Sequence, residues 1–465
     1  MPPDKAGIIP RLRPRSAFPT QPVRPLNERQ MSSSLRPSAC PGLLRIVQAL
    51  DGGICRIKLN GGSISADQAE AVACAAERFA GGVIEATNRA NLQIRGIGGE
   101  HAALIDSLMA AGLGPSSAAG DDVRNLMLSP SAGIDQHLLI DTRPLAGQIL
   151  ATLQNDARMH DLSAKFAVQL DGGEALAMLE HPHDLWLSAV ERDGEQRWAF
   201  GLAGCPTDFP AGSVARDQGH ALVVAVLELF LEGARPEQTR MRHLLAECSL
   251  DAFLARLAER VSLKAIEGWQ RIAGPDFLHI GAHPQRDAER VYIGAVPPLG
   301  RLDPAMLRGV AQLAREHGNA SLRFTPWQSL LLPGVHTEYA AQVIHSLEQL
   351  GLRCSADDAL AQLIACTGST GCGKGLADTK GDARQLAALL QRQGQALNIH
   401  LSGCSRSCAA AHIAPITLLA VSTGHYDLYF RDAAQPGFGA LHARSLTIEA
   451  VAALLDDRSR SPLDA

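Results

Sequence analysis

The chain has 465 residues, of which 46% are hydrophobic and 20% are charged, and its formal net charge is −5. This length allows two to four domains with buried cores, and the composition is that of an ordinary soluble globular protein. The charge gives no reason to expect a nucleic-acid partner. No apolar run approaches the roughly 20 residues that cross a bilayer, so we expect no membrane association.

The first 40 residues differ in composition from the rest of the chain. Residues 1–40 are rich in Pro, Arg and Ser, nearly free of acids and without hydrophobic periodicity. They lack the apolar core of a secretory signal, although an Arg- and Ser-rich leader is superficially similar to an organelle transit peptide. We interpret them as a disordered tail, or as the result of an upstream start codon with Met31 as the true start.

An internal repeat follows this tail. Segments 62–97 and 300–335 align without a gap, and each combines a helical pattern with a short apolar strand. Ser65 and Asp303 are the predicted N-caps of the two helices. The similar stretches at 41–46 and 275–280 predict a further strand at the start of each unit.

The repeat continues into a second pair of segments. Residues 125–143 lie opposite 362–380, and both segments end in Asp-Thr followed by a basic residue. Farther along, the apolar strand that begins at Phe166 matches the one that begins at Leu397. The predicted architecture is therefore two copies of a pair, each made of a small α+β unit and a larger α/β unit.

Ten cysteines without a secretory signal indicate the reducing cytoplasm, where cysteine clusters bind metal or do redox work more often than they form disulfides. Six are scattered singly, and we interpret them as buried apolar thiols. They are Cys40, Cys55, Cys74, Cys205, Cys248 and Cys354. The remaining four, which fall within a short stretch of the second copy, are Cys366, Cys372, Cys404 and Cys408.

The repeat indicates that these four thiols form one site. Their counterparts in the first copy all lack a thiol, whereas cysteines kept for packing would be expected to differ one by one. The pairs are Cys366 with Ser129, Cys372 with Asp135, Cys404 with Gly173 and Cys408 with Ala177.

The stretch around the first two cysteines allows two interpretations. Residues 368–374 spell most of a phosphate-binding loop, but Gly375 stands where the Mg²⁺-coordinating Ser or Thr should be. The alternative is a metal loop: C-x5-C and C-x3-C each follow an apolar strand, and glycines soften both bends. Four thiolates suit Zn²⁺ or an iron–sulfur cluster, and the five-residue spacer favours a cluster over a zinc knuckle. Four unligated core thiols are the remaining alternative.

This cysteine spacing on a duplicated chain resembles the sulfite and nitrite reductase family. The resemblance runs from Pro41 to about Leu455, and it implies a [4Fe–4S] cluster beside sirohaem in a duplicated α+β fold. It implies two ferredoxin-like half-domains and two larger α/β half-domains related by the internal repeat. The predicted segments are a 1–40 tail, ferredoxin-like halves at 41–115 and 275–352, a clusterless larger domain at 120–270, and a cluster-binding domain at 356–460.

The family's anion- and tetrapyrrole-contacting elements have counterparts in this sequence. "TNRANLQIRG" resembles its "TxR" element and gives Arg89 and Arg95, and its "RN" element matches Arg124 with the following Asn. Its "R-K-F-K" element matches only in part, because Lys165 is kept but Ala167 replaces the second lysine. The resemblance implies substrate binding by Arg89, Arg95, Arg124 and Lys165, and the lost lysine places sulfite or nitrite reduction in doubt.

Longer segments, among them "LHIGAHPQR" and "LSGCSRSCAAAH", are similar to the cobalamin-pathway branch of this family. That resemblance implies a monooxygenase that uses O₂ to hydroxylate precorrin-3A and forms a γ-lactone before ring contraction. It also implies a mononuclear non-haem iron near the cluster. The sequence has no clear 2-His-1-carboxylate set, so the candidate ligands are His279, His283, His400 and His412. The alternatives are a sirohaem-dependent reductase and a non-catalytic zinc-stabilised protein.

Precorrins carry many carboxylates, so a cleft that binds them needs dispersed guanidinium groups. Arg143 and Arg323 are further candidates for that role. No G-x-G-x-x-G follows a clear strand, so we expect the electrons to come from a separate donor protein. The catalytic residues themselves are not readable from the sequence.

Overall fold

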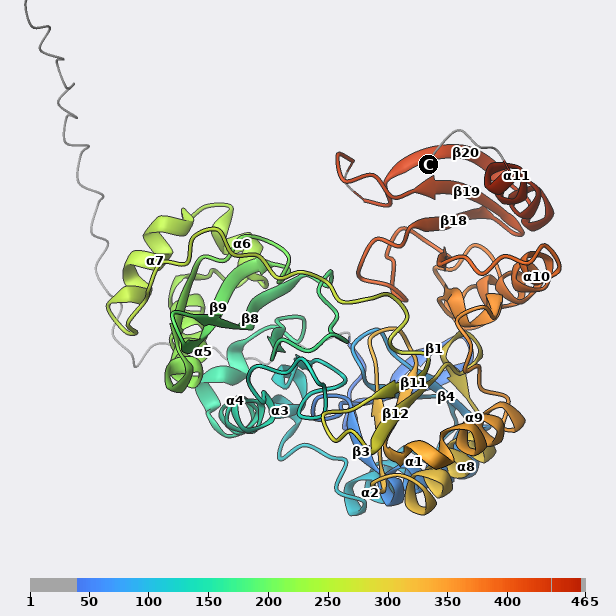
Figure 1. The fold of residues 1–465 in the computed structure, drawn as a ribbon, viewed down its shortest axis with the longest axis horizontal. Coiled ribbons are helices and arrows are strands. Elements are labelled where there is room, and N and C mark those ends of the chain that lie inside the picture. The colour runs from blue at the N-terminus through green and yellow to red at the C-terminus, as the bar shows by residue number, and fades with distance from the viewer. Residues whose placement is uncertain (1–39, 436, 461–465) are drawn as a thin grey trace, which may run out of the picture. The chain divides into compact units, whose positions relative to one another are not determined.

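The computed structural model of the protein describes residues 40–435 and 437–460 (Figure 1). The predicted tail therefore lies outside the described residues, except for Cys40. Within the described part of the chain, every helix is too short or too polar to cross a bilayer.

Two small sheets exchange edge strands. The first has the order β1-β2-β5-β4-β13, and the second has the order β11-β12-β15-β14-β3. Strand β13 comes from the second repeat but pairs with β4 of the first, and β3 of the first pairs with β14 of the second. The first sheet contains β1 (Val47–Ala49), β2 (Gly52–Ile57), β4 (Val83–Ala86), β5 (Leu92–Ile97) and β13 (Arg301–Leu302). The second contains β3 (Ser63–Ser65), β11 (Gly281–Pro284), β12 (Arg290–Ala295), β14 (Ser321–Phe324) and β15 (Leu330–His336).

Helices cover these sheets and begin at the predicted caps. The side chain of Ser65 accepts the N–H of Gln68, and the Gln68 side chain accepts the N–H of Ser65, which is a complete capping box. Asp303 accepts the N–H of Met306 at 2.8 Å. Both predicted N-caps are therefore confirmed. The four helices of this part are α1 (Ala66–Phe79), α2 (His101–Ala110), α8 (Pro304–Glu316) and α9 (Ala340–Gln349).

The two repeats share one hydrophobic core in this part of the molecule. Ile64 and Val72 from the first repeat and Leu302, Val310 and Leu322 from the second all belong to it, and each is at most 2% exposed. Because each repeat lends a strand to the other's sheet, the buried apolar surface cannot be divided between two separate cores.

The two larger sheets repeat one topology. In each, the first three strands are parallel and the remaining pairs are antiparallel. The first contains β6 (Leu126–Leu128), β7 (Val168–Asp171), β8 (His183–Arg192), β9 (Glu195–Gly204) and β10 (Gly212–Ala215). The second contains β16 (Leu363–Ala365), β17 (Ile399–Ser402), β18 (Ile416–Ser422), β19 (His425–Phe430) and β20 (Ala440–Leu446).

Each larger sheet has its own core and its own helices. Helices α4 and α10 occupy the same place in the repeat, between the first and second strands. The first copy carries α3 (Ala118–Val123), α4 (Arg143–Asn155), α5 (Gly219–Gly233), α6 (Met241–Leu245) and α7 (Leu250–Ala258). The second carries α10 (Thr379–Arg392) and α11 (Ile448–Arg460).

The strands predicted at 41–46 and 275–280 are wrong in position, because both stretches lack a strand and the first strand of each unit follows them. The N–H of Gly42 donates to the carbonyl of Arg45 at 3.0 Å, which closes a turn. The second stretch turns at Phe277, whose φ is +62°. Local turns therefore use the backbone groups that a strand ladder would need.

Candidate functional site

The cysteine loops leave neighbouring parallel strands at the same edge of the second larger sheet. Cys366 follows β16 directly, and Cys404 follows β17 after one glycine. Ala365 and Leu401 are partners in the parallel ladder, so the carboxyl ends of the two strands meet. The fold therefore brings the two loops together, as the sequence predicted.

The thiols lie within electrostatic range of one another. The N–H of Gly403 donates to Sγ of Cys366 at 3.2 Å, which links one loop to the other. Although Cys408 is exposed at the surface, desolvation of its thiol raises its pKa, and the charges of Cys404, Cys366 and Cys372 raise it further. A [4Fe–4S] cluster fits this donor set, since it takes four thiolates and N–H donors to sulfur.

No three His, Cys, Asp or Glu side chains among the described residues are arranged to hold a single metal ion. A tetrahedral zinc site needs its ligands to converge on one such point. The thiolates of a [4Fe–4S] cluster instead bind different irons. The choice of a cluster over one zinc ion, and the ligation of that cluster by the four cysteines, remain predictions.

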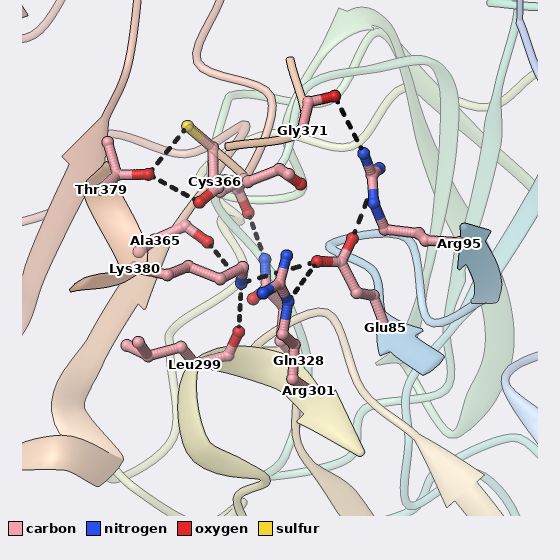
Figure 2. Close-up of polar contacts among 12 residues, drawn as sticks. Glu85, Arg95, Leu299, Arg301, Gln328, Ala365, Cys366, Gly371, Thr379 and Lys380 are labelled. Atoms are coloured by element: carbon pink, nitrogen blue, oxygen red, sulfur yellow. Dashed lines mark hydrogen bonds and ion pairs between the residues drawn. The ribbon is translucent and has the colours of Figure 1, made fainter. Parts of the chain in front are cut away.

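A buried polar network contacts the start of the first cysteine loop, which contains Cys366 and Cys372 (Figure 2). Nζ of Lys380 donates to the carbonyls of Ala365 and Leu299 at 3.1 and 2.6 Å. It also lies 3.8 Å from Oε1 of Glu85, which accepts from Nε of Arg301 at 2.9 Å. Burial alone would raise the pKa of Glu85, but Lys380, Arg95 and Arg301 together hold it below its usual value.

Two further hydrogen bonds hold the loops themselves. Oγ1 of Thr379, the first residue of α10, donates to the carbonyl of Cys366 at 2.7 Å. Nε2 of Gln328 donates to the carbonyl of Ala409 at 3.0 Å, directly after the last cysteine. The small sheets and the larger sheet thus both fix the geometry of the cysteine loops.

The four predicted substrate-binding cations have different surroundings. Arg95 is paired with Asp51 and Glu85, and Arg124 is paired with Asp121. Lys165 is exposed on the loop before β7, with no ion pair among the described residues. Arg89 is half-buried, and its guanidinium likewise has no carboxylate partner in the part of the chain that the structure describes.

Arg56 is a functional candidate that the sequence interpretation missed. It lies on β2, where alternate residues are buried, and it points to the face opposite Cys55 and Ile57. Its Nε is buried without a hydrogen-bond partner among the described residues. Desolvation lowers the pKa of Arg89, and the positive charge of Arg56 lowers it further. The alternating pattern of β2 was the available signal, because an arginine on the non-core face of a strand faces either solvent or a cleft.

Two neighbouring cations that form no ion pair with a carboxylate among the described residues favour an anion. Arg56 senses the charge of Cys408, so the pair also lies near the cysteine loops. Arg323 and Arg143, the other candidates, have different surroundings. Nη1 of Arg323 donates to two backbone carbonyls of the first copy, and Arg143 forms an exposed ion pair.

Ala167 is linked to the surroundings of Arg89 through its contact with Asp184. Its N–H donates to Oδ2 of Asp184 at 2.9 Å, and the same carboxylate pairs with Arg240 at 2.8 Å. Both Asp184 and Arg240 influence the pKa of Arg89. The position where the reductase element carries its second lysine therefore has only a methyl group in this chain.

Buried histidines form another part of the site. Of the four predicted candidates, His279, His400 and His412 are buried, and Nε2 of His283 is hydrogen-bonded to the carbonyl of Ile280. Burial lowers the pKa of His279 and of His400 to about 3. The sequence interpretation missed two further buried histidines of the first copy: His181, which lies two residues before β8, and His183, which is the first residue of β8.

Polar side chains occupy the corresponding loops of the first copy. Asp135 accepts from Oγ of Ser131 at 2.8 Å, and Asp171 pairs with Arg271 at 2.7 Å. Burial, followed by the charge of Asp171, raises the pKa of Glu174 to about 8. The first copy thus fills with hydrogen bonds and an ion pair the space where the second offers four thiols.

Two family models match most of the chain. The model described as "Nitrite/Sulfite reductase ferredoxin-like half domain" matches residues 47–112 and 283–350. The model described as "Nitrite and sulphite reductase 4Fe-4S domain" matches residues 119–265, which is the copy that lacks the four clustered cysteines.

Two kinds of curated protein are similar to the chain. The chloroplastic ferredoxin–nitrite reductase of Zea mays is 30% identical over 409 residues, covering 80% of this chain and 70% of the reductase. The precorrin-3B synthase of Sinorhizobium sp is 30% identical over 395 residues, covering 84% of this chain and 83% of the synthase. The solved NirA protein of Mycobacterium tuberculosis has the same fold, with a TM-score of 0.74 at 20% identity over 89% of this chain and 82% of NirA.

Proposed function

The chain belongs to the nitrite and sulfite reductase family of [4Fe–4S] oxidoreductases, and from that membership we propose that it is a precorrin-3B synthase. The proposed reaction uses O₂ and electrons from a separate donor protein to hydroxylate precorrin-3A and to close the γ-lactone. The ten free thiols are consistent with the cytoplasmic setting that this proposal includes.

The proposal rests mainly on Arg56 and Arg89, which form no ion pair among the described residues, together with the loss at Ala167 of a lysine that the reductases carry. Arg56 and Arg89 offer two guanidinium groups to a polycarboxylate, and guanidinium pairs with carboxylate through two parallel hydrogen bonds. A tetrapyrrole with many acetate and propionate groups fits this chemistry. Ala167 cannot hold or donate a proton to a small oxyanion, so reduction of nitrite or sulfite would lack one of its cations.

The match to the synthase extends over a larger share of that relative than the matches to two of the reductases do. The chain covers 83% of the Sinorhizobium synthase but 70% of the Zea mays reductase and 66% of the Oryza sativa enzyme.

The residues described above have separate tasks in the proposed reaction. Arg56 and Arg89 bind and orient the substrate carboxylates above the cysteine loops. Cys366, Cys372, Cys404 and Cys408 would hold the cluster, which supplies electrons one at a time when bound. Lys380, Glu85 and Arg301 keep the first loop in place. A mononuclear non-haem iron, the further cofactor of this proposal, would supply the chemistry that activates O₂.

A sirohaem-dependent nitrite or sulfite reductase is the second candidate. The 30% identity to the Zea mays nitrite reductase favours it, since that match covers 80% of this chain. In that case Arg56 and Arg89 would bind the carboxylates of sirohaem instead of those of a substrate.

Anaerobic purification, with iron, acid-labile sulfide and zinc counts and a visible spectrum, separates these functions. The synthase predicts about four irons and four sulfides for the cluster, one further iron and no sirohaem bands. The purified protein should then convert precorrin-3A in the presence of O₂ and a reductant. Tightly bound sirohaem together with nitrite or sulfite turnover would refute the synthase, and one zinc without sulfide would refute both enzymes.

Matched cysteine variants test the cluster ligands. Cys366→Ser should lose most of the iron and sulfide, because serine is a poor ligand for this cluster. Cys74→Ser, which changes an exposed thiol on α1, should retain both. Equal cluster content in the two variants would contradict the assignment of the ligands.

A further inference from the structure

Three buried histidines lie together where the two larger copies meet near the arginine pair. His181 and His183 come from the first copy, and His412 comes from the second, four residues after the last cysteine of the cluster loops. The ring centroids of His181 and His412 are 6.2 Å apart, and those of His181 and His183 are 5.7 Å apart. Both pairs of rings are close to perpendicular, with interplanar angles of 73° and 84°.

Three ring nitrogens of this group, two on His181 and one on His412, have no hydrogen-bond partner among the described residues. His181 is 2% exposed, and neither of its ring nitrogens has a hydrogen-bond partner among the described residues. His412 is 8% exposed, and its Nδ1 is likewise buried without such a partner. Because an imidazole nitrogen that is buried and unpaired is costly, these atoms are open to a metal ion or a water molecule.

The histidine group also lies close to Arg89, whose charge acts on the imidazole of His181.

His183 is held in a way that restricts its neighbour. Its Nδ1 is hydrogen-bonded to the carbonyl of His181 at 2.7 Å, which fixes the backbone of His181 beside the ring. This hydrogen bond restricts the backbone of residues 181–183.

Space for further ligands lies next to His412. A cavity of about 200 Å³ is lined by His412, His279, Trp327 and Glu180 among others. The rings of His279 and Trp327 stack at 4.9 Å, so they form a rigid wall of this cavity. The volume accommodates several waters or a diatomic molecule, and it is smaller than the roughly 300–1,000 Å³ of typical small-molecule sites.

We infer that His181 and His412 are the protein ligands of a single divalent transition-metal ion, with its other coordination positions open to water or O₂. Two ligands are proposed because no three His, Cys, Asp or Glu side chains in the described ranges surround one point. The site joins the two copies of the chain and lies within electrostatic range of Arg89. That the natural ion is iron rests on the proposed function, since imidazole also binds zinc, copper and nickel.

Metal binding is tested on the anaerobically purified full chain with its cluster intact. After loosely bound metal is removed with a mild chelator, Co²⁺ is added as a probe, and its ligand-field absorption and bound stoichiometry are measured. We expect one equivalent to bind. His181→Gln and His412→Gln should each weaken Co²⁺ binding at least tenfold, with unchanged cluster content and thermal unfolding. His345→Gln, an exposed histidine on α9, is the matched control and should bind normally.

The outcomes separate this inference from the proposed function. Full Co²⁺ affinity in both glutamine variants would overturn the metal site, whether or not the enzyme converts precorrin-3A. Conversion of precorrin-3A by a protein with no metal beyond its cluster would overturn the inference and leave the function standing. Metal binding that depends on His181 and His412, in a protein that does not convert precorrin-3A, would support the site and contradict the function.

Discussion

Arg95 forms a two-point ion pair with Asp51: its Nε and Nη2 each donate to one carboxylate oxygen at 2.9 Å. Nη2 also donates to the carbonyl of Gly371 at 3.3 Å, between the first two cysteines. The guanidinium therefore connects β5 to the first cysteine loop, and its charge is already balanced by protein. Arg95 was predicted from the family resemblance to bind substrate, and these contacts favour a supporting role for it.

Replacing Arg95 should lower the cluster content and the stability of the fold more than it lowers substrate affinity. Arg95→Lys keeps the charge but cannot make two parallel hydrogen bonds and reach Gly371. We expect unfolding to become easier by about 1–3 kcal/mol and the iron content to fall. The control is Arg143→Lys, whose pair with Asp141 has the same form but is exposed, so its effect should be below about 1 kcal/mol. Chemical denaturation and iron analysis measure both, and equal effects would contradict this role.

Removing either unpaired arginine should weaken binding of the tetrapyrrole. Arg56→Met and Arg89→Met each remove one charge-assisted contact worth about 1.5–3 kcal/mol, which corresponds to roughly 10- to 100-fold in affinity. Neither change breaks an ion pair within the described residues, so the free energy of unfolding should not decrease. Arg242→Met, on an exposed position of α6, should bind normally. Fluorescence titration with the tetrapyrrole measures the affinities, and normal binding by both variants would exclude this pair as the carboxylate site.

Two glycines of the first cysteine loop should respond differently to alanine. Gly368 has a φ of +70°, and a Cβ there would lie 2.6 Å from the carbonyl oxygen of Ala377. A Cβ at Gly373 would meet nothing within 4 Å. Gly368→Ala should therefore cost about 1–3 kcal/mol and lower the cluster content, whereas Gly373→Ala should be nearly neutral. Sulfide analysis and thermal unfolding of the two variants decide the point. A cluster retained in full by Gly368→Ala would show that this bend is not required.

Ionisation of the buried Glu174 carboxyl group should lower the free energy of unfolding as the pH rises. Its pKa of about 8 in the folded chain is above its ordinary value of 4.5, so the folded state keeps a proton that the unfolded state has released. Stability then falls as the pH rises from about 4.5 through 8, by up to about 1.4 kcal/mol per pH unit. Glu174→Gln keeps an acceptor for the N–H of Gly172 and removes this dependence.

The pH dependence is measured by denaturant unfolding at pH 6, 7 and 8. The variant should gain stability over the parent chain as the pH increases. Glu100→Gln, which changes an exposed carboxyl group, should follow the parent chain at every pH. Parallel curves for Glu174→Gln and the parent would show that Glu174 is ionised in the folded protein.

Local sequence patterns predicted the features that depend on neighbouring residues. The N-caps Ser65 and Asp303 bond to groups three residues away, and Cys366 and Cys404 follow strands that their own apolar residues define. The repeat then indicated which segments far apart in the sequence belong to equivalent units, because aligned segments are expected to occupy equivalent places in the two copies. The fold of the family is confirmed by the domain models and by the solved NirA protein.

The remaining features depend on partners that are far apart in the sequence. Asp51 and Arg95 are 44 residues apart, and His181 and His412 belong to different copies. Neither relationship has a local pattern. Strand β13 has only two residues, which is too few to show any period. A family motif also cannot show whether an arginine that matches it is already paired, as Arg124 is with Asp121.

The exchanged strands β3 and β13 restrict the evolution of this protein, because they make each half depend on the other for folding. Either half, released from the other, would have a sheet lacking an edge and a core open to water. The two halves can therefore carry different side chains in their loops, thiols in one and carboxylates in the other. Neither half can fold as a separate protein, because each completes its small sheet with a strand of the other.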